Sequence, residues 1–232
     1  MVHLLEDPAL RNREAVFRDR NDAGRRLAAF MRQHSPVTEP LVCAIPAGGI
    51  PIGLELAKGF QARMFLGVVR KLKIPWNPEA GFGSMTWNGK VYLNKELVRT
   101  LNLTDEEIRQ AVAETEKNIR ERIEQFTGGL SIPPIHGMTV IITDDGLASG
   151  YTMKAAVEAL NSENPEKIIV AVPTGSAKSV AMISGMVATT ICLNLRDYYP
   201  FAVADAYQNW YDLDDDEVIR SLSLARKNQL LY

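Results

Sequence analysis

The sequence predicts an α/β fold, a single domain built on a five-stranded, mainly parallel, doubly wound sheet. Two observations support this prediction. Between residues 40 and 195, short apolar runs alternate with longer amphipathic runs, which is the pattern of successive βαβ units. The short runs are apolar throughout and rich in β-branched residues, as strands covered on both faces by helices are. We therefore expect helices on both faces of one sheet.

The strands and the helices between them follow from this alternation. Thr104 and Glu107 have the spacing of a capping box, and an apolar repeat follows as far as Gly128, so a long exposed helix is expected there. A second helix directly follows the third strand, because apolar residues recur at helical spacing from Met153 until Pro165 stops the pattern. The five expected strands span residues 41–46, 64–69, 139–143, 168–172 and 187–193.

The core is expected to cover residues 39–195, with one segment that protrudes from it and one segment that flanks it at each end. Residues 71–94 contain two prolines, three glycines and an Asn-Gly turn signal, so they predict a mobile loop or hairpin that could act as a lid. Residues 11–32 hold seven arginines against three acids, whereas the carboxyl-terminal tail is acidic and is expected to end in a helix over 217–224. We therefore expect residues 1–38 and 196–232 to form a small hood above the sheet. The alternative is two solvated ends that never meet.

Composition excludes several classes of protein. The chain of 232 residues carries 26 basic and 28 acidic side chains, and this near balance gives no support to nucleic-acid binding. It shows no secretory signal and no apolar stretch long enough for a membrane span, so a cytoplasmic protein is expected. The two cysteines, Cys43 and Cys192, each lie in an apolar run and are expected to be buried thiols. Small-molecule chemistry is the remaining expectation.

The stretch from Val140 to Thr152 carries the clearest chemistry. An expected strand leads into Asp144 and Asp145 and then, through a turn of small residues, into a helix. A helix amino terminus offers unpaired N–H groups, so the turn suits a phosphate. The two carboxylates suit vicinal sugar hydroxyls, or a magnesium ion held through water. The pattern therefore predicts a sugar-phosphate site, although a buried acid pair that merely caps the next helix would look alike.

A second glycine turn follows the first expected strand, at Ala47, Gly48 and Gly49. Its spacing is neither that of a dinucleotide-binding fingerprint nor that of a P-loop, because no Gly-Lys-Ser or Gly-Lys-Thr follows. Taken alone, the turn is a weak signal.

The stretch from 140 to 152 resembles the thirteen-residue signature of the type I phosphoribosyltransferases, which bind phosphoribosyl pyrophosphate (PRPP). This resemblance implies that Asp144 and Asp145 meet the ribose hydroxyls. It implies that the 5′-phosphate is wrapped by the following turn, which comprises Gly146, Leu147, Ala148, Ser149, Gly150, Tyr151 and Thr152. The turn at residues 47–49 resembles the family's pyrophosphate loop. Many relatives have a basic residue where this chain has Ala47.

The resemblance covers most of the chain and is close to one branch of predicted phosphoribosyltransferases. That branch has a basic pair before an Asn-Pro-Glu loop, here Arg70 and Lys71, and residues 17–24 also match it. The resemblance implies that Arg70 and Lys71 serve the pyrophosphate, whereas a solvated strand end is the plainer interpretation. The aromatic residues after the last strand, Tyr198, Tyr199 and Phe201, are candidates for stacking on an acceptor, or for cementing the tail onto the sheet.

The resemblance implies an enzyme that transfers the 5-phosphoribosyl group from PRPP to a nitrogen acceptor, a nucleobase or related amine, and releases pyrophosphate. Asp144, Asp145, Arg70 and Lys71 are its candidate catalytic residues. Magnesium is the expected cofactor, held by PRPP and water near the acid pair without direct protein ligands. PRPP and a small acceptor are the expected partners, with no nucleic acid and no membrane, and a homodimer is left open. The alternative, favoured by Ala47, is a non-catalytic PRPP- or nucleotide-binding regulator.

Overall fold

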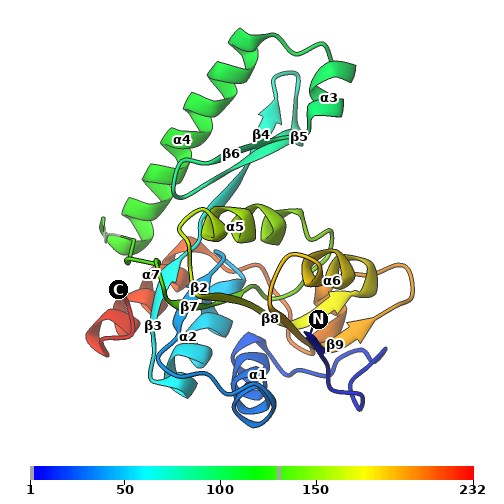
Figure 1. The fold of residues 1–232 in the computed structure, drawn as a ribbon, viewed down its shortest axis with the longest axis vertical. Coiled ribbons are helices and arrows are strands. Elements are labelled where there is room, and N and C mark those ends of the chain that lie inside the picture. The colour runs from blue at the N-terminus through cyan, green and yellow to red at the C-terminus, as the bar shows by residue number, and fades with distance from the viewer. Residues whose placement is uncertain (1–2, 130–131) are drawn as a thin grey trace.

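The computed structural model describes residues 3–129 and 132–232, and its centre is a parallel sheet of six strands (Figure 1). The spatial order is β1-β9-β8-β7-β2-β3, and every neighbouring pair is parallel. The strands are β1 (His3–Leu5), β2 (Leu41–Ala44), β3 (Arg63–Leu66), β7 (Thr139–Thr143), β8 (Lys167–Ser176) and β9 (Thr189–Arg196). The prediction of an α/β fold with a mainly parallel sheet is therefore confirmed.

The sheet has one strand more than the five predicted. The additional strand is β1, which pairs with β9 at the edge of the sheet. It has only three residues, none of them buried, so it contains no apolar run long enough to predict a strand. The strands β8 and β9 are also longer than predicted, because their pairing continues past Val172 and Cys192 to Ser176 and Arg196.

Helices cover both faces of the parallel sheet (Figure 1). The helices α1 (Arg20–His34) and α2 (Gly49–Phe60) pack together on one face, and α5 (Tyr151–Asn161) and α6 (Ala177–Ser184) lie on the other. The first pair of helices is close because Gly24 faces Glu55, where an added Cβ would come 2.8 Å from the Glu55 Cβ. Doubly wound packing of this kind leaves the carboxyl ends of the strands open for a ligand.

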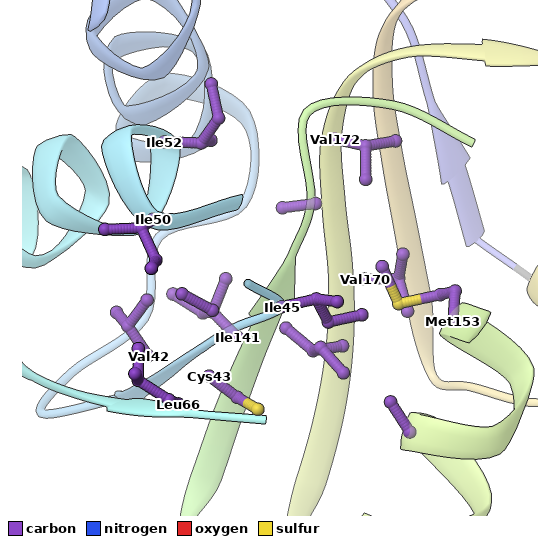
Figure 2. Packing of buried hydrophobic residues seen from close by; sticks show 14 of the residues in the cluster. Val42, Cys43, Ile45, Ile50, Ile52, Leu66, Ile141, Met153, Val170 and Val172 are labelled. Atoms are coloured by element: carbon purple, nitrogen blue, oxygen red, sulfur yellow. The ribbon is translucent and has the colours of Figure 1, made fainter. Parts of the chain in front are cut away.

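The core consists of β-branched and other apolar side chains between these layers. Figure 2 shows Ile50 and Ile52 of α2 on one side of the strands and Met153 of α5 on the other, with Ile141 and Val170 between them. All five side chains are buried. The two cysteines are also buried and unpaired, and burial raises the pKa of both thiols.

An arm projects from the parallel sheet (Figure 1). It consists of a three-stranded antiparallel sheet, the short helix α3 (Lys95–Thr100) and the long helix α4 (Asp105–Thr127). The antiparallel strands are β4 (Val69–Ile74), β5 (Asn77–Thr86) and β6 (Val91–Leu93). The segment 71–94, predicted as a mobile loop or hairpin, forms antiparallel hairpins, and the Asn-Gly turn signal lies between β5 and β6. The buried Leu72, Phe82 and Met85 anchor it.

The predicted capping box at the start of α4 is confirmed. The Glu107 N–H donates to the Thr104 hydroxyl, and the Glu107 carboxylate accepts from the Thr104 N–H. The helix ends at Gly128, whose φ of 60° lies in the left-handed region that glycine adopts without strain.

The two ends of the chain meet beside the sheet. The Phe17 N–H donates to the Ala206 carbonyl, and the Gln208 N–H donates to the Phe17 carbonyl. The chain then passes the 3-10 turn η1 (Val203–Ala206) and ends in α7 (Asp215–Lys227), which packs against α4 and α2. None of the described helices combines the length and the apolar character that crossing a membrane requires.

Candidate functional site

The candidate site lies where the direction of the chain through the sheet reverses. From β2 the chain moves outward to β3, and from β7 it moves outward the other way through β8 and β9, so the switch point lies between β2 and β7. Ala44 and Thr143, the last residues of these strands, are register partners. Ligands of doubly wound sheets bind at such a point, beyond the carboxyl ends of the strands.

Both predicted turns meet at this point. An added Cβ at Gly48 would come 2.0 Å from the Asp145 Oδ2 atom, and an added Cβ at Gly49 would come 2.8 Å from the Thr143 carbonyl oxygen. Only glycine permits these approaches, because any side chain would displace the acid pair or the end of β7. The glycines therefore serve close packing of the two turns.

The two helices that begin at this point differ from the others at their amino termini. Of the seven α-helices in the described residues, five have a side chain that accepts from a backbone N–H of the first turn, and α2 and α5 have none. An amino terminus of this kind presents the positive end of the helix dipole. In α2 the Gly49 and Ile50 N–H groups donate to the Ile45 and Ala47 carbonyls and Pro51 has no N–H, so α2 offers chiefly its dipole. Two adjacent helix amino termini without a side-chain cap therefore flank the acid pair.

The turn from Gly146 to Thr152 is open to solvent and fixed from below. Ala148, Ser149, Tyr151 and Thr152 are exposed, whereas Leu147 is buried and bridges to Gly175 of β8. The Leu147 N–H donates to the Thr174 carbonyl over 3.0 Å, and Gly150 has a φ of 77°. The turn before α5 is thus anchored to β8 through Leu147, while its small residues Ala148 and Ser149 face solvent.

A basic residue that sequence analysis did not select completes the site. Arg20, the first residue of α1, has only 7% of its surface exposed, and its Nε atom donates to the Asp145 Oδ2 atom over 2.9 Å. Its Nη1 atom donates to the Tyr211 carbonyl over 2.9 Å. The guanidinium also stacks on Trp210, 3.9 Å from the ring centroid. Arg20 therefore joins α1, the acid pair and the carboxyl-terminal segment.

Tyr207 holds the backbone of the same acid. Its buried hydroxyl donates to the Asp145 carbonyl over 2.6 Å, and its ring lies beside those of Phe17 and Trp210. The segment that follows η1 thus brings two aromatic rings to the acid pair. These rings were not among the predicted acceptor residues.

The electrostatics of the acid pair are dominated by burial. Loss of solvent raises the pKa of Asp144 well above its usual range, and the neighbouring Asp145 charge raises it further. Burial also raises the pKa of Asp145, but the Arg20 guanidinium opposes that rise. Burial beside the acids raises the pKa of the Tyr207 phenol. Arg20 is thus the main stabiliser of negative charge in the site.

Arg70 and Lys71 lie at the start of the arm rather than in contact with the acid pair. The backbone just before them returns to β2, where the Gly67 N–H donates to the Ala44 carbonyl. Arg70 donates from Nε to Asn118 of α4 over 3.1 Å, and Lys71 donates from Nζ to the Glu79 carbonyl of β5 over 2.6 Å. The backbone of both residues is therefore near the open end of the sheet, while both side chains are engaged within the arm.

The predicted acceptor residues surround another arginine. Arg196, at the end of β9, has its guanidinium 4.7 Å from the Tyr198 ring centroid and 5.1 Å from that of Phe201. Tyr198 also donates its hydroxyl to Glu14, and Tyr199 is 94% exposed. These contacts pack the carboxyl-terminal segment against the end of β9. Binding of the acceptor by these rings stays a prediction.

One sequence signal for Arg20 was present. Asp19 caps α1, so Arg20 occupies the first turn, where the helix dipole disfavours a positive charge. A basic residue in that position is stabilised when an acidic partner lies nearby in the fold. The identity of that partner depends on tertiary structure, because Asp145 lies 125 residues away.

The chemistry of the acid pair suits magnesium. No group of three or more acidic, histidine or cysteine side chains that could hold a metal occurs among residues 3–129 and 132–232. Magnesium, however, usually binds through one or two carboxylates or their water, and takes its other ligands from substrate phosphates. Asp144 and Asp145, between two helix amino termini, fit such a shared site.

Comparisons with known proteins agree with this geometry. A family model described as "Phosphoribosyl transferase domain" matches residues 14–204. Two proteins of Mycobacterium tuberculosis, "Putative phosphoribosyl transferase Rv0571c" of strain H37Rv and MT0597 of strain CDC 1551, which has the same description, are each 36% identical over 214 residues. The matched region is 92% of this chain and 48% of each relative, so the chain spans about half the length of these relatives.

The fold also matches a solved structure. The protein TT1426 from Thermus thermophilus superposes with a TM-score of 0.74 at 27% identity, over 89% of this chain and 97% of that chain. The resemblance found in the sequence is thus confirmed by a family match, by relatives and by a fold match. The chain belongs to the phosphoribosyl transferase domain family.

Proposed function

We propose that this protein transfers the 5-phosphoribosyl group of PRPP to a nitrogen acceptor, a nucleobase or related amine, with release of pyrophosphate. The observation that carries the proposal is the pair of uncapped helix ends at the switch point, with the acid pair between them. PRPP has two phosphate-bearing ends separated by a ribose, so two anion sites that flank two carboxylates match its charge pattern.

Different residues of the site are assigned to the ribose, the 5′-phosphate and the pyrophosphate of PRPP. Asp144 and Asp145 accept hydrogen bonds from the ribose hydroxyls, and the turn from Gly146 to Thr152 holds the 5′-phosphate. We assign the N–H groups of Ala47 and Gly48 to the pyrophosphate, with Arg70 and Lys71 contributing charge when their present contacts are exchanged. The Gly49 N–H, which was also predicted to serve the pyrophosphate, donates to the Ile45 carbonyl over 2.9 Å. When bound, magnesium would neutralise the departing pyrophosphate, held by PRPP and by water near the acid pair.

The chemical step needs little covalent help from the protein. The bond between C1 and the pyrophosphate oxygen breaks and a bond from C1 to the acceptor nitrogen forms, while one of the acids takes the proton that the nitrogen loses. Positioning the acceptor, stabilising the leaving group and excluding water are the remaining tasks. The arm begins just after Gly67, which contacts the end of β2, and we assign exclusion of water to its residues 71–94.

A second candidate is a PRPP- or nucleotide-binding regulator without turnover. Ala47 favours it, because the loop assigned to pyrophosphate lacks a cationic side chain, and Arg70 and Lys71 are engaged elsewhere. We rank the transferase first because the acid pair, both helix ends and the arm are all present. Either protein would work in the cytoplasm on small molecules, and a homodimer is compatible with both.

Calorimetric titration with PRPP and magnesium, compared with ribose 5-phosphate, tests the proposal. We expect PRPP to bind at least about tenfold tighter, which is about 1.4 kcal/mol. Asp145→Asn should lose this binding, whereas Asp212→Asn, an exposed acid of the tail, should not. Equal affinity for the two ligands, or binding of neither, would remove the pyrophosphate site from the proposal. If PRPP is preferred, a screen of nucleobases and amines for pyrophosphate release then separates the transferase from the regulator.

A further inference from the structure

Arg20 is held on three sides in the interior of the protein. Its guanidinium donates to the Asp145 carboxylate and to the Tyr211 carbonyl, and one face stacks on Trp210. The side chain is 8% exposed, compared with 61% for Arg18 and 48% for Arg25 on either side of it. The neighbouring arginines of this segment are therefore solvated, whereas Arg20 is buried.

We propose that Arg20 is a positioning residue of the PRPP site: it fixes the Asp145 carboxylate in the orientation that the ribose hydroxyls require. This inference rests on the proposed function and adds to it a residue from outside the sheet. It also gives the amino-terminal helix a part in substrate binding.

The geometry around Asp145 supports this role. Its Oδ2 atom lies between the Arg20 Nε atom at 2.9 Å and the backbone of Gly48, which leaves no room for a Cβ. Its carbonyl oxygen is held by the Tyr207 hydroxyl at 2.6 Å. One end of the chain thus fixes the side chain and the other end fixes the backbone. We assign the Oδ1 atom to the ribose.

Stability alone gives a poor reason for this arrangement. A buried ion pair repays its desolvation cost only in part, and apolar residues of similar volume often replace such a pair without loss of stability. The position in the first turn of α1 adds a further cost through the helix dipole. Burial of Arg20 is therefore better explained by its effect on Asp145, whose charge it stabilises and whose carboxylate it orients.

Neutral and charged replacements of Arg20 test the inference. Arg20→Met keeps an apolar stem against Trp210, and Arg20→Lys keeps the charge. By calorimetry with PRPP and magnesium, we expect Arg20→Met to bind at least about tenfold more weakly than the native protein. Arg20→Lys should recover to within about fivefold of the native protein, because lysine restores the charge without the planar fork. The matched control, Arg25→Met on the same helix, should bind as the native protein does.

Thermal unfolding separates positioning from a merely structural role. We expect Arg20→Met to lower the midpoint, because the buried Asp145 carboxylate loses its charged partner. At a temperature well below that midpoint, where the variant is folded, its PRPP binding should still be weaker than that of the native protein, and Arg20→Lys should recover most of both losses. A loss of binding that follows a loss of stability in both Arg20→Met and Arg20→Lys would overturn the inference. Should Arg20→Met not fold, Arg20→Gln, which keeps a donor in the buried site, takes its place with the same expected loss.

A double-mutant cycle gives a second measurement. If Arg20 acts through Asp145, Arg20→Met should weaken PRPP binding by less than about twofold when Asp145→Asn is already present, because the two effects share one contact. Phosphorus NMR at millimolar PRPP extends the titration to weak binders. Equal losses in both backgrounds would overturn the inference. Native protein that binds no PRPP would remove the proposed function itself, whereas native binding with an unchanged Arg20→Met would remove only the role of Arg20.

Discussion

The carboxylate of Asp145 lies directly against the backbone of Gly48. A Cβ atom at residue 48 would come 2.0 Å from the Asp145 Oδ2 atom, far closer than side-chain atoms approach one another. The loop after β2 therefore packs directly against the loop after β7, and a change in the backbone of one loop displaces side chains of the other. The candidate site is one unit made from two distant parts of the sequence.

Gly48→Ala should disrupt this unit. The methyl group displaces the Asp145 carboxylate and with it the contact to Arg20, so we expect PRPP binding to weaken by at least about tenfold. Calorimetry on Gly48→Ala measures the loss. Gly185→Ala is the matched control, because a Cβ there has no neighbour closer than 3.6 Å. Native-like PRPP binding by Gly48→Ala would show that the acid pair need not keep its present position.

Asp144→Asn should stabilise the fold at neutral pH while it abolishes PRPP binding. Burial and the Asp145 charge raise the pKa of Asp144 in the folded state above the unfolded value of 3.8, so the ionised carboxylate destabilises the native state. This cost is fully present above the folded-state pKa and is lost as the pH falls toward the unfolded value. We therefore expect a higher midpoint of thermal unfolding for Asp144→Asn at pH 8, and a difference that shrinks on acidification.

Asn keeps the oxygen that accepts from the Asp145 N–H, so this variant removes charge with little change in hydrogen bonding. Asp216→Asn, an exposed acid of α7, is the control and should show no such pH-dependent gain. An unchanged or lower midpoint for Asp144→Asn at pH 8 would mean that the acid pair is well solvated.

Much of the framework could be predicted because its signals are local. The strands β2 and β7 are continuous apolar runs, and the two glycine turns follow them directly, so their meeting at one sheet edge follows from parallel topology. The edge strand β1 is too short to give a pattern. The partner of Arg20 could not be predicted either, because the charge of an arginine does not specify which of 28 acids it will meet.

The arm shows a second limit of sequence patterns. The prolines and glycines of residues 71–94 predict the turns of a hairpin, which the structure contains, but they predict neither the third strand nor the packing beside α4. The order of this segment comes from burial of side chains such as Phe82 against distant residues, which a local pattern does not contain.

Thr104→Ala should destabilise the protein through the start of α4. The variant removes the hydroxyl that accepts from the Glu107 N–H, and loss of such a cap costs about 1 kcal/mol. For a chain of this size, that loss lowers the unfolding midpoint by about 2–4 °C. Thr100→Ala, at an exposed position of α3, is the control and should change the midpoint less. PRPP binding should not change in either variant, because α4 begins in the arm.

Ala47→Lys tests whether binding at the loop that we assign to pyrophosphate, residues 47–49, is limited by charge. Ala47 is partly exposed and lies beside Gly48, so a lysine there would bring an ammonium group to the uncapped end of α2. A charge-assisted contact to a phosphate is worth about 1.5–3 kcal/mol in favourable geometry, and less in solvent. We expect inorganic pyrophosphate to bind about tenfold tighter at low salt. Ribose 5-phosphate, which does not reach this loop, should bind as before.

Ala47→Met supplies the control, because it adds similar bulk without charge. The gain should fall as the ionic strength rises, since a partly exposed ion pair is screened. A gain in Ala47→Lys alone would show that the loop faces the leaving group and that the native protein meets its charge by other means, with magnesium and Arg70 or Lys71 as the candidates. If Ala47→Lys gains nothing, or Ala47→Met gains as much, the loop does not face pyrophosphate. The regulator would then explain the geometry of the acid pair and the α5 end better than the transferase does, because a ribose-phosphate ligand uses only that half of the site.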